Sequence, residues 1–443
     1  MPYVRLLARM KDNLRILFVR RANSALVTLF AFIFGIGSSF AQSTAPANSP
    51  GNSDTVPSAK ESAITWDNGI HVRSRNGLAE LEIGGMVQAD ERVFAGPYPP
   101  RKLPDLILRR GRVVLLGTGL KRLDFRIMAE SQKNGAFVVR DAYVDFKVHH
   151  GIQIELGKFK SPVGLERLQS ARYLMFTERT FVTGLVPDRD IGIQLHGDLL
   201  GNRVTYMGGL FRGVPDGGSS ENSVNHGADA EYRVFVYPFR GWRATLLGGL
   251  GIGIGGSAGT EEGTLPSFTT AGLAKFFSYR PGAIADGERT RVSPQASYYW
   301  HGLGMMTEYV ISAQDIRIRD IVQRVSNTAW QVSSSLVLTG ENASYSGITP
   351  SHAFDPVNRH WGAFEIAGRI NSLGVDPHAF PVLADPNAAA QKANGYQMGL
   401  NWYPQEYVKC IFNFAQTRFL GGAVSGNRLT ENAFIIRIQF SYY

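Results

Sequence analysis

Residues 153–195 read QIELGKFKSPVGLERLQSARYLMFTERTFVTGLVPDRDIGIQL. The stretch opens with strict alternation, in which Ile154 and Leu156 flank the polar Glu155, and a second alternating run begins near Ile191. Between the two runs lie about thirty residues with neither a strand nor a helix pattern. A connection this long between two strands is usually functional. It either folds into the interior of a closed sheet or lies at the surface.

The connection, which we expect over residues 158–188, is rich in charge and not of low complexity. The charged residues in and just after it are Lys158, Lys160, Arg167, Arg172, Arg179 and Arg189, with Glu166, Glu178, Asp188 and Asp190. We interpret it as a loop folded into the bore of a barrel. An ordinary surface loop is the alternative, and the rest of the chain has to decide.

The first 41 residues have the features of a secretory signal peptide. Six basic residues accompany a short apolar run at residues 25–36, and Ser39, Phe40 and Ala41 form a small-x-small cleavage site. A transmembrane anchor is disfavoured because the apolar run is too short to span a bilayer. Residues 42–77 are expected to be a linker or N-terminal extension, since residues 43–54 are rich in Ser, Pro, Ala and Asn.

Charge and cysteine content exclude several classes of protein. The formal net charge is +9, but residues 1–41 hold six basic residues and one acidic residue, so the rest of the chain carries only +4. This gives little support for a nucleic-acid partner. The single cysteine, Cys410, excludes an intramolecular disulfide framework and a cysteine metal site. After the signal no apolar run approaches 18 residues, so an exported chain of this kind is periplasmic or an outer-membrane barrel.

Period-two alternation recurs from residue 78 to residue 443, as where Phe125 and Ile127 alternate with Asp124 and Arg126. Short connections are expected at residues 119–121, 149–151, 201–202, 239–241 and 404–406, and long ones at residues 95–104, 158–188, 212–227, 256–270 and 340–357. Tight turns at one end and long loops at the other are typical of a bacterial outer-membrane barrel. Strands in lipid must pair all their backbone groups, so the sheet has to close.

The predicted fold is therefore all-β, a transmembrane antiparallel β-barrel over residues 78–443. A soluble sandwich or propeller is disfavoured because charges stand at mid-strand positions and no blade-length repeat occurs. About seventeen candidate strands can be counted, whereas a single-chain barrel should have an even number. We predict 16 strands, with 18 as the alternative, and expect the miscount between residues 243 and 319.

Several motifs resemble those of the phosphate-selective porin O and P family. The most specific is GKFKSPVGLE at residues 157–166, which runs on to FTERT at residues 176–180. Others are LEIGGMVQAD at 81–90, LRRGRV at 108–113, DAYVDF at 141–146, SPQASYYWHGLGMMTEY at 293–309, LTGE at 338–341, WGAF at 361–364 and NWYP at 401–404.

The resemblance implies a trimeric, 16-stranded channel in the outer membrane of a Gram-negative bacterium. It implies that the loop after Gly157 folds inward as a constriction, and that anions diffuse passively through the pore, phosphate or polyphosphate above all. Lys160 matches the lysine of the family's loop motif. On this basis the candidate constriction and anion-binding residues are Lys158, Lys160, Arg167, Arg172 and Arg179.

Alternation places further cations on the lumen face, and rings of Arg or Lys give anion pores. The candidate pore-lining residues are Arg126, Arg233, Arg291, Arg369 and Arg437. Acidic residues share these faces, so a general or differently selective porin with a mixed-charge lumen is the alternative function. The direction of Arg110 and Arg112 is left open because leucines share their phase, and Arg140 falls on an apolar phase and is expected at a rim.

Catalysis is not predicted. The histidines are scattered, no H-E-x-x-H occurs, and the G-x-S-x-G at residues 255–259 precedes no helix pattern. A purely structural or adhesive barrel would differ from a channel in having a plugged lumen. No cofactor or metal is expected. The expected partners are inorganic phosphate or other small anions, outer-membrane lipid and further copies of the chain in a homotrimer, and no nucleic acid.

Overall fold

The structure is a computed structural model that describes residues 63–66, 69–74, 76–95, 106–132, 135–222, 227–242 and 245–443. The chain divides into two units, Met1–Ala59 and Lys60–Tyr443. The first unit lies outside the described residues, and with it the expected signal peptide. Residues 42–62 of the expected linker lie outside them too.

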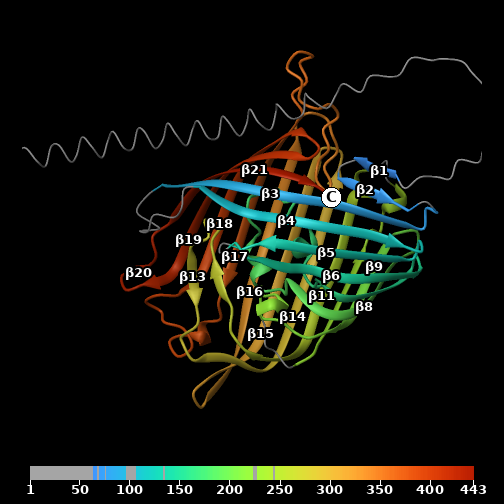
Figure 1. Cartoon of the computed structure of the whole chain (residues 1–443). Coiled ribbons are helices and arrows are strands. Elements are labelled where there is room, and N and C mark those ends of the chain that lie inside the picture. The colour runs from blue at the N-terminus through green and yellow to red at the C-terminus, as the bar shows by residue number, and fades with distance from the viewer. Residues whose placement is uncertain are drawn as a thin grey trace, which may run out of the picture. The chain divides into compact units, whose positions relative to one another are not determined.

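Within the described residues, sixteen antiparallel strands form a closed barrel (Figure 1), so the predicted strand count is confirmed. Each barrel strand pairs with the next along the chain, and β21 pairs back with β3 to close the sheet. The barrel strands are β3 Ala79–Ala95, β4 Leu106–Gly119, β5 Leu123–Ser131, β6 Phe137–His149, β7 Ile152–Lys160, β8 Arg189–Leu199, β9 Val204–Phe211, β10 Asp229–Val236, β11 Leu250–Gly263, β14 Ala283–Trp300, β15 Leu303–Ile318, β16 Ile321–Val337, β17 Ala363–Gly374, β18 Ala390–Gln405, β19 Val408–Ala423 and β21 Glu431–Tyr442.

Shorter elements decorate the barrel. Strands β1 and β2 form a hairpin that pairs with the first half of β3, and β12 and β13 form a second hairpin between β11 and β14. These elements are β1 Ala63–Trp66, β2 Ile70–Arg73, β12 Ser267–Thr269, β13 Lys275–Ser278, β20 Gly426–Asn427, α2 Leu165–Leu168, η1 Phe181–Gly184, η2 Ser220–Asn222, η3 Arg240–Trp242, η4 Leu246–Gly249 and η5 Pro377–Ala379. Among the described residues no helix is both long enough and apolar enough to cross a membrane.

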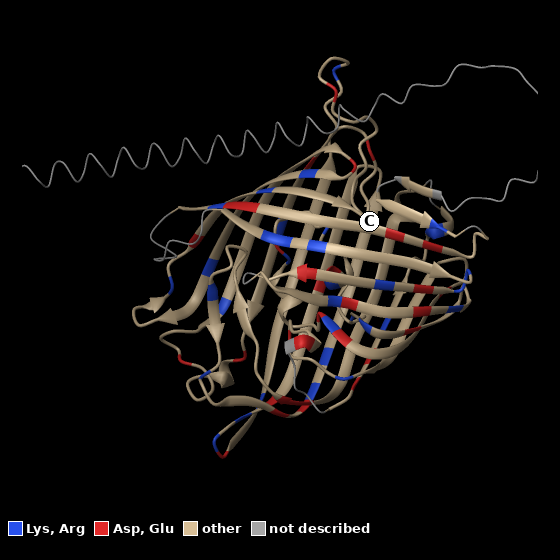
Figure 2. Cartoon of the chain, in the orientation of Figure 1, with Lys and Arg blue, Asp and Glu red and all other residues tan. Residues whose placement is uncertain are grey.

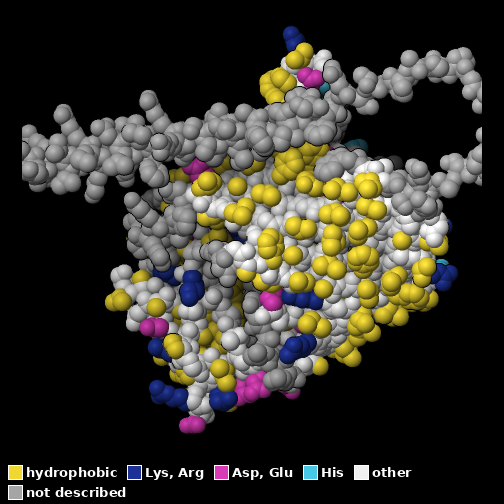
Figure 3. All heavy atoms as spheres, in the orientation of Figure 1, with side chains coloured by type: hydrophobic (Ala, Val, Ile, Leu, Met, Phe, Trp, Pro, Cys, Tyr) yellow, Lys and Arg dark blue, Asp and Glu magenta, His cyan; other side chains and the backbone are white. Residues whose placement is uncertain are grey.

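Alternation along the strands separates a lipid-type exterior from a polar interior. In β15, Tyr309 and Ile311 are exposed on the outside, whereas Glu308 and Ser312 are buried inside. Hydrophobic side chains are spread over the barrel face seen in Figure 3, where few charged side chains appear. An apolar exterior suits the hydrocarbon of a bilayer, and each of the sixteen described barrel strands is hydrogen-bonded to a neighbouring strand on both sides.

The connections differ from the prediction in three places. The tight turn predicted at residues 239–241 is wrong, because the whole of residues 237–249, with η3 and η4, separates β10 from β11. The predicted connection at residues 256–270 begins too early, because β11 continues to Gly263. Residues 338–362, between β16 and β17, also emerge at the end of the barrel that carries most of the tight turns, whereas β15 and β16 are joined by only two residues at the opposite, long-loop end. Loop length alone therefore does not assign the end of the barrel from which a connection emerges.

Residues 161–188, between β7 and β8, form the long loop that organises the interior. Strand β7 continues to Lys160 and β8 starts at Arg189. The predicted loop at residues 158–188 therefore starts too early, and Lys158 and Lys160 belong to the barrel wall. Two connections at the long-loop end, β11–β14 and β17–β18, pack against this loop in an apolar core that includes Val182, Phe268 and Leu383. This core fills part of the lumen on the side of β14–β19.

Candidate functional site

The long loop (residues 161–188) begins its path across the lumen against the wall of β14 and β15. The backbone N–H groups of Leu165 and Glu166 donate to the carboxylate of Glu308 at 2.9 and 3.1 Å. From the other end of the barrel, Tyr345 in residues 338–362 donates its hydroxyl to the Leu165 carbonyl at 2.6 Å. A loop inside a barrel must find such partners because its buried backbone groups cannot all reach water.

Further along the long loop, side chains of the wall satisfy its carbonyl groups. Lys409 of β19 donates to the Leu174 carbonyl at 2.8 Å, and Asn401 of β18 donates to the Met175 carbonyl at 2.9 Å. Gln88 of β3 donates to the carbonyl of Ala171 at 3.2 Å. The predicted inward fold of the loop is therefore confirmed, and many of the polar mid-strand residues serve to hold it.

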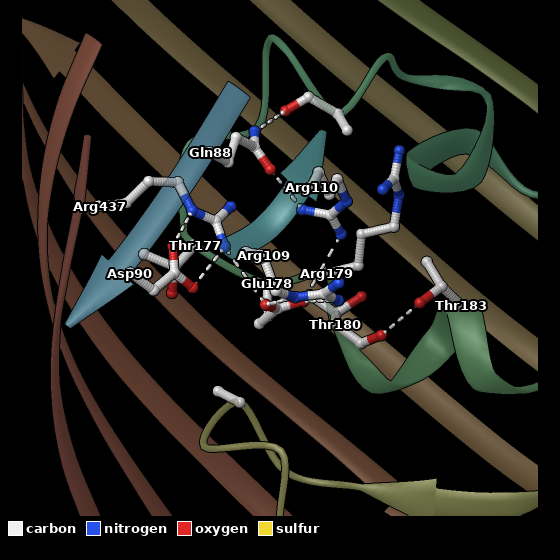
Figure 4. Close-up of polar contacts among 12 residues, drawn as sticks. Gln88, Asp90, Arg109, Arg110, Thr177, Glu178, Arg179, Thr180, Thr183 and Arg437 are labelled. Atoms are coloured by element: carbon white, nitrogen blue, oxygen red, sulfur yellow. Dashed lines mark hydrogen bonds and ion pairs between the residues drawn. The ribbon is translucent and has the colours of Figure 1, made fainter. Parts of the chain in front are cut away.

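Glu178 is the point at which the long loop is held most strongly (Figure 4). Arg109 donates to both of its carboxylate oxygens, at 2.6 and 2.9 Å. Arg92 and Arg437 donate to one of them at 2.9 and 3.3 Å, and Arg110 lies at 3.7 Å. Burial by itself raises the pKa of Glu178, but the neighbouring guanidinium groups outweigh burial and hold that pKa well below its usual range. Glu178 is therefore ionised at neutral pH.

A β-bulge in β4 explains how neighbouring arginines all reach the lumen. Gln88 of β3 lies opposite Arg110 of β4, and the next residue of β3 lies opposite Leu108. Arg109 therefore has no residue opposite it on β3. An extra residue shifts the phase of the side chains by one. Leu108 is consequently 63% exposed on the outside, whereas Arg110 and Arg112 are buried inside. The open question about the direction of these two arginines is thereby settled.

A second bulge, in β6, does the same for Arg140. Asp141 pairs with Met128, and Val139 pairs with the following residue of β5, which leaves Arg140 as the extra residue. Its guanidinium donates to Asp188 at 2.6 Å and also to Glu221. The expected place of Arg140 at a rim is wrong, because the bulge turns the side chain into the lumen.

A cavity of about 560 Å³ lies between the long loop and the inner face of β4–β8. Nine basic side chains and four acidic ones line it, an excess of five positive charges. Figure 2 shows the blue bands on β4 and the red and blue bands on β5 and β6 that contribute to it. The charged lining residues are Arg109, Arg110, Arg112, Arg126, Arg140, Lys160, Arg167, Arg179 and Arg189, with Glu130, Asp141, Glu155 and Asp188.

Lys160, Arg167, Arg179 and Arg126, which the sequence singled out, all line this cavity. Lys160 donates to the carbonyl groups of two loop residues, 168 and 169, at 2.7 and 2.8 Å. Arg179 also binds backbone carbonyl groups, and neither cation has a carboxylate within ion-pair distance among the described residues. Burial lowers the pKa of Arg179 to about 10, so its guanidinium stays charged at pH 7.

The other two loop-motif cations lie elsewhere. Lys158 forms an ion pair with Glu221 and donates to the carbonyl of Val139 at 2.8 Å. Arg172 donates to the carbonyl of Tyr443 and is not part of the cavity lining.

The remaining predicted pore-lining arginines point inward but are covered by the inserted connections. Arg233 donates to Gln295 at 3.0 Å, and Arg291 forms an ion pair with Asp216 at 2.7 Å. Arg369 and Arg437 hold the long loop through its acidic residues, at 3.2 and 3.3 Å respectively. These four arginines stabilise the filling of the lumen and do not border the cavity.

Comparison with known proteins places the chain in a family. The family described as phosphate-selective porin O and P matches residues 81–247 and 277–442. The chain belongs to this family. Porin O of Pseudomonas aeruginosa is 24% identical to this porin over 425 residues, which cover 86% of this chain and 92% of the relative. The resemblance inferred from the motifs is thereby confirmed, and the porin is an outer-membrane channel protein.

Solved structures share the fold of this porin. The outer-membrane channel DcaP of Acinetobacter baumannii has a TM-score of 0.54 at 10% identity, covering 84% of this chain and 99% of that one. An anion-selective porin from Comamonas acidovorans has a TM-score of 0.52 at 13% identity, covering 82% and 100%. The trimer form of OmpT of Vibrio cholerae has a TM-score of 0.51 at 12% identity, covering 82% and 99%. At these identities the likeness shows the barrel fold alone.

Sequence reasoning did not place five cations in the cavity wall: Arg109, Arg110, Arg112, Arg140 and Arg189. Four of them stand in or after a bulge, which simple alternation cannot reveal. A signal was nonetheless present, because the phase of β4 changes within the run LRRGRV at residues 108–113. Among the described residues, no cluster of three or more His, Cys, Asp and Glu side chains is arranged to hold a metal ion.

Proposed function

We propose that this porin conducts anions across the outer membrane by passive diffusion, and that phosphate or polyphosphate is the preferred class. The observation that carries the proposal is the excess of basic over acidic side chains, nine against four, in the lining of the cavity between the long loop and β4–β8. In a narrow passage with low-dielectric walls, such an excess raises the local concentration of anions.

The chemistry of the lining suits an oxyanion. Eight of the nine cations are arginines, whose planar guanidinium groups bind phosphate in a bidentate manner. Most of these guanidinium groups already share a carboxylate, as Arg112 does with Glu130 at 2.5 Å. An anion therefore shares donors that are already engaged, which keeps its binding weak enough for release.

The proposal also covers the processing of the chain, the residues that contact the anion and the assembly of the protein. Residues 1–41 act as a cleaved signal peptide, and residues 42–77 as a linker or extension before the barrel. The cavity cations Lys160, Arg167, Arg179 and Arg126 contact the permeant anion. Lys158, which donates to the Val139 carbonyl of β6, and Arg172, which donates to the Tyr443 carbonyl, lie outside the cavity and do not contact it. The assembly is a homotrimer, an arrangement supported by the family resemblance and by the trimer form of OmpT.

A general porin with a mixed-charge lumen is the second candidate. It is favoured by the four carboxylates of the lining, which oppose cations such as Arg189, paired with Asp141 at 2.6 Å. Opposed charges of this kind set up a transverse field without strong ionic preference.

A planar-bilayer experiment distinguishes the two candidates. The protein without residues 1–41 is reconstituted under a KCl gradient, and phosphate is then titrated against the chloride current. Anion selectivity with a saturable phosphate block supports the first candidate, whereas cation or no selectivity without block overturns it. Arg126→Gln should weaken the anion preference without loss of fold, because Asp141 keeps its bond to Arg189. Arg324→Gln, on an exposed side chain outside the cavity, is the matched control.

A further inference from the structure

One carboxylate in the cavity is not neutralised. Glu130, Asp141 and Asp188 each form ion pairs with arginines. Glu155 differs from these three, because among the described residues no Lys, Arg or His nitrogen lies within ion-pair distance of it. Its side-chain partner is the carboxamide of Gln194, which donates to it.

Glu155 belongs to an acidic row on the inner wall. The strand register sets Asp124 of β5 opposite Asp145 of β6, and Asp145 opposite Glu155 of β7. Directly opposed like charges destabilise a sheet. Lys147 pairs with Asp124, and His196 lies 3.1 Å from Asp145, so the two other members of the row have a basic partner. Glu155, the member of the row that lines the cavity, is therefore the one without a basic partner among the described residues.

A second, independent feature adds an acceptor at the same place. Gln194 is 4% exposed and also lines the cavity. Its Nε2 is used by Glu155, and its Oε1 has no hydrogen-bond partner among the described residues. A buried carbonyl oxygen left without a donor is costly, and a ligand that donates a hydrogen bond removes that cost.

The same cavity holds unpaired charge of the opposite sign. Lys160 and Arg179 bind only backbone carbonyl groups, so neither is paired with a carboxylate in the part of the chain that the structure describes. Neither lies within ion-pair distance of Glu155, although all three border one space of about 560 Å³. Opposite charges that share a cavity without touching can both be satisfied by a solute that carries an anionic group and a cationic group.

We propose that the passage selects zwitterionic oxyanions, in which a phosphate or phosphonate group meets the arginines and a primary ammonium group meets Glu155 and Gln194. The inference rests on the proposed function, because the anionic group uses the same cations. It goes beyond that function by assigning Glu155 to the binding of an ammonium group, which a simple anion lacks. A simple anion would in fact be repelled by Glu155.

Two matched probes test the proposal. Ethylphosphonate and 2-aminoethylphosphonate differ by one amino group, and at about pH 9 the amine is protonated while both phosphonates are ionised. Each is titrated against the chloride current of the full barrel in a planar bilayer. A hydrogen bond between two charged groups is worth about tenfold in affinity. The amino compound is therefore expected to block at about tenfold lower concentration in the wild type.

Variants separate the role of Glu155 from a general effect of charge. Glu155→Gln keeps the shape and should bring the two half-blocking concentrations together. Asp198→Asn removes one negative charge from neighbouring β8 outside the cavity and should leave the tenfold ratio unchanged. Arg126→Gln should weaken both probes by the same factor.

The outcomes are distinguishable. Equal block by the two probes in the wild type, or weaker block by the amino compound, overturns the zwitterion proposal while leaving anion conduction intact. A tenfold ratio that survives Glu155→Gln also overturns it, since the ammonium site must then lie elsewhere. Absence of block by either probe, together with a reversal potential that shows no anion preference, refutes the proposed function itself.

Discussion

Replacement of Glu178 by Gln tests how the long loop is held inside the barrel. The change keeps the size of the side chain but removes the charge that faces four guanidinium groups. Arg109 would lose a bidentate pair at 2.6 and 2.9 Å, and Arg92 would lose a contact at 2.9 Å. Because Glu178 and Arg92 are both buried, breaking this arrangement leaves uncompensated positive charge in a site with little water.

The magnitude follows from burial. Removal of one partner of a buried ion pair costs about 3–5 kcal/mol, whereas an exposed pair contributes less than about 1 kcal/mol. We therefore expect Glu178→Gln to lower the free energy of unfolding by about 3–5 kcal/mol. The control is Glu288→Gln, whose side chain is 79% exposed and 4.0 Å from Arg324. It should change stability by less than about 1 kcal/mol.

The assay is reversible urea unfolding of the barrel in lipid vesicles, followed by tryptophan fluorescence. If Glu178→Gln and Glu288→Gln lower the free energy of unfolding equally, water must screen the Glu178 cluster. The loop would then be held mainly by its backbone hydrogen bonds. A double-mutant cycle with Arg109→Gln measures the coupling energy between Glu178 and Arg109 apart from the contributions of the other arginines.

Three further predictions follow from the geometry. The folded-state pKa of Glu178 is lowered, so the stability that Glu178 contributes is fully present above its unfolded value of about 4.3 and is lost as the pH falls through the lower folded value. The difference in unfolding free energy between the wild type and Glu178→Gln should therefore be constant from about pH 8 to about pH 5 and shrink below about pH 4. Gly157→Ala should reduce the folded fraction on heat-modifiability gels, because the φ of Gly157 is +132° and the new Cβ would lie 2.3 Å from the Ala142 carbonyl oxygen. Gly368→Ala is the control and should have no effect, because a Cβ at that position meets open space. Deletion of Arg109 removes the β4 bulge and should lower the folded fraction, whereas Arg109→Gln retains the bulge and should not lower it to the same degree.

The barrel could be predicted from the sequence because lipid imposes a rule that each strand obeys locally. Apolar and polar residues must alternate on every strand, so the pattern is visible in a few residues such as Leu123–Ser131. The inward loop was suggested by the absence of any such pattern between β7 and β8. The family resemblance then decided between a lumen loop and a surface loop.

The composition of the cavity wall could not be predicted because it depends on bulges and on which connections cover which wall. A bulge at Arg109 or Arg140 changes a phase that the sequence pattern assumes to be constant. Arg291 and Arg369 face inward as alternation requires, yet the inserted connections bury them. Coverage of this kind depends on contacts between residues far apart in the chain, such as Glu166 with Arg369.

The long loop also has a consequence for the order of folding. Glu178 meets Arg437, and Gln439 donates to the carbonyl of Arg172, so these contacts join positions more than two hundred residues apart in the chain. Both contacts require β21, the strand that closes the sheet by pairing with β3. We therefore expect the loop to dock late, once β21 has joined the barrel. Substitutions in the loop should speed unfolding while leaving the rate of membrane insertion almost unchanged.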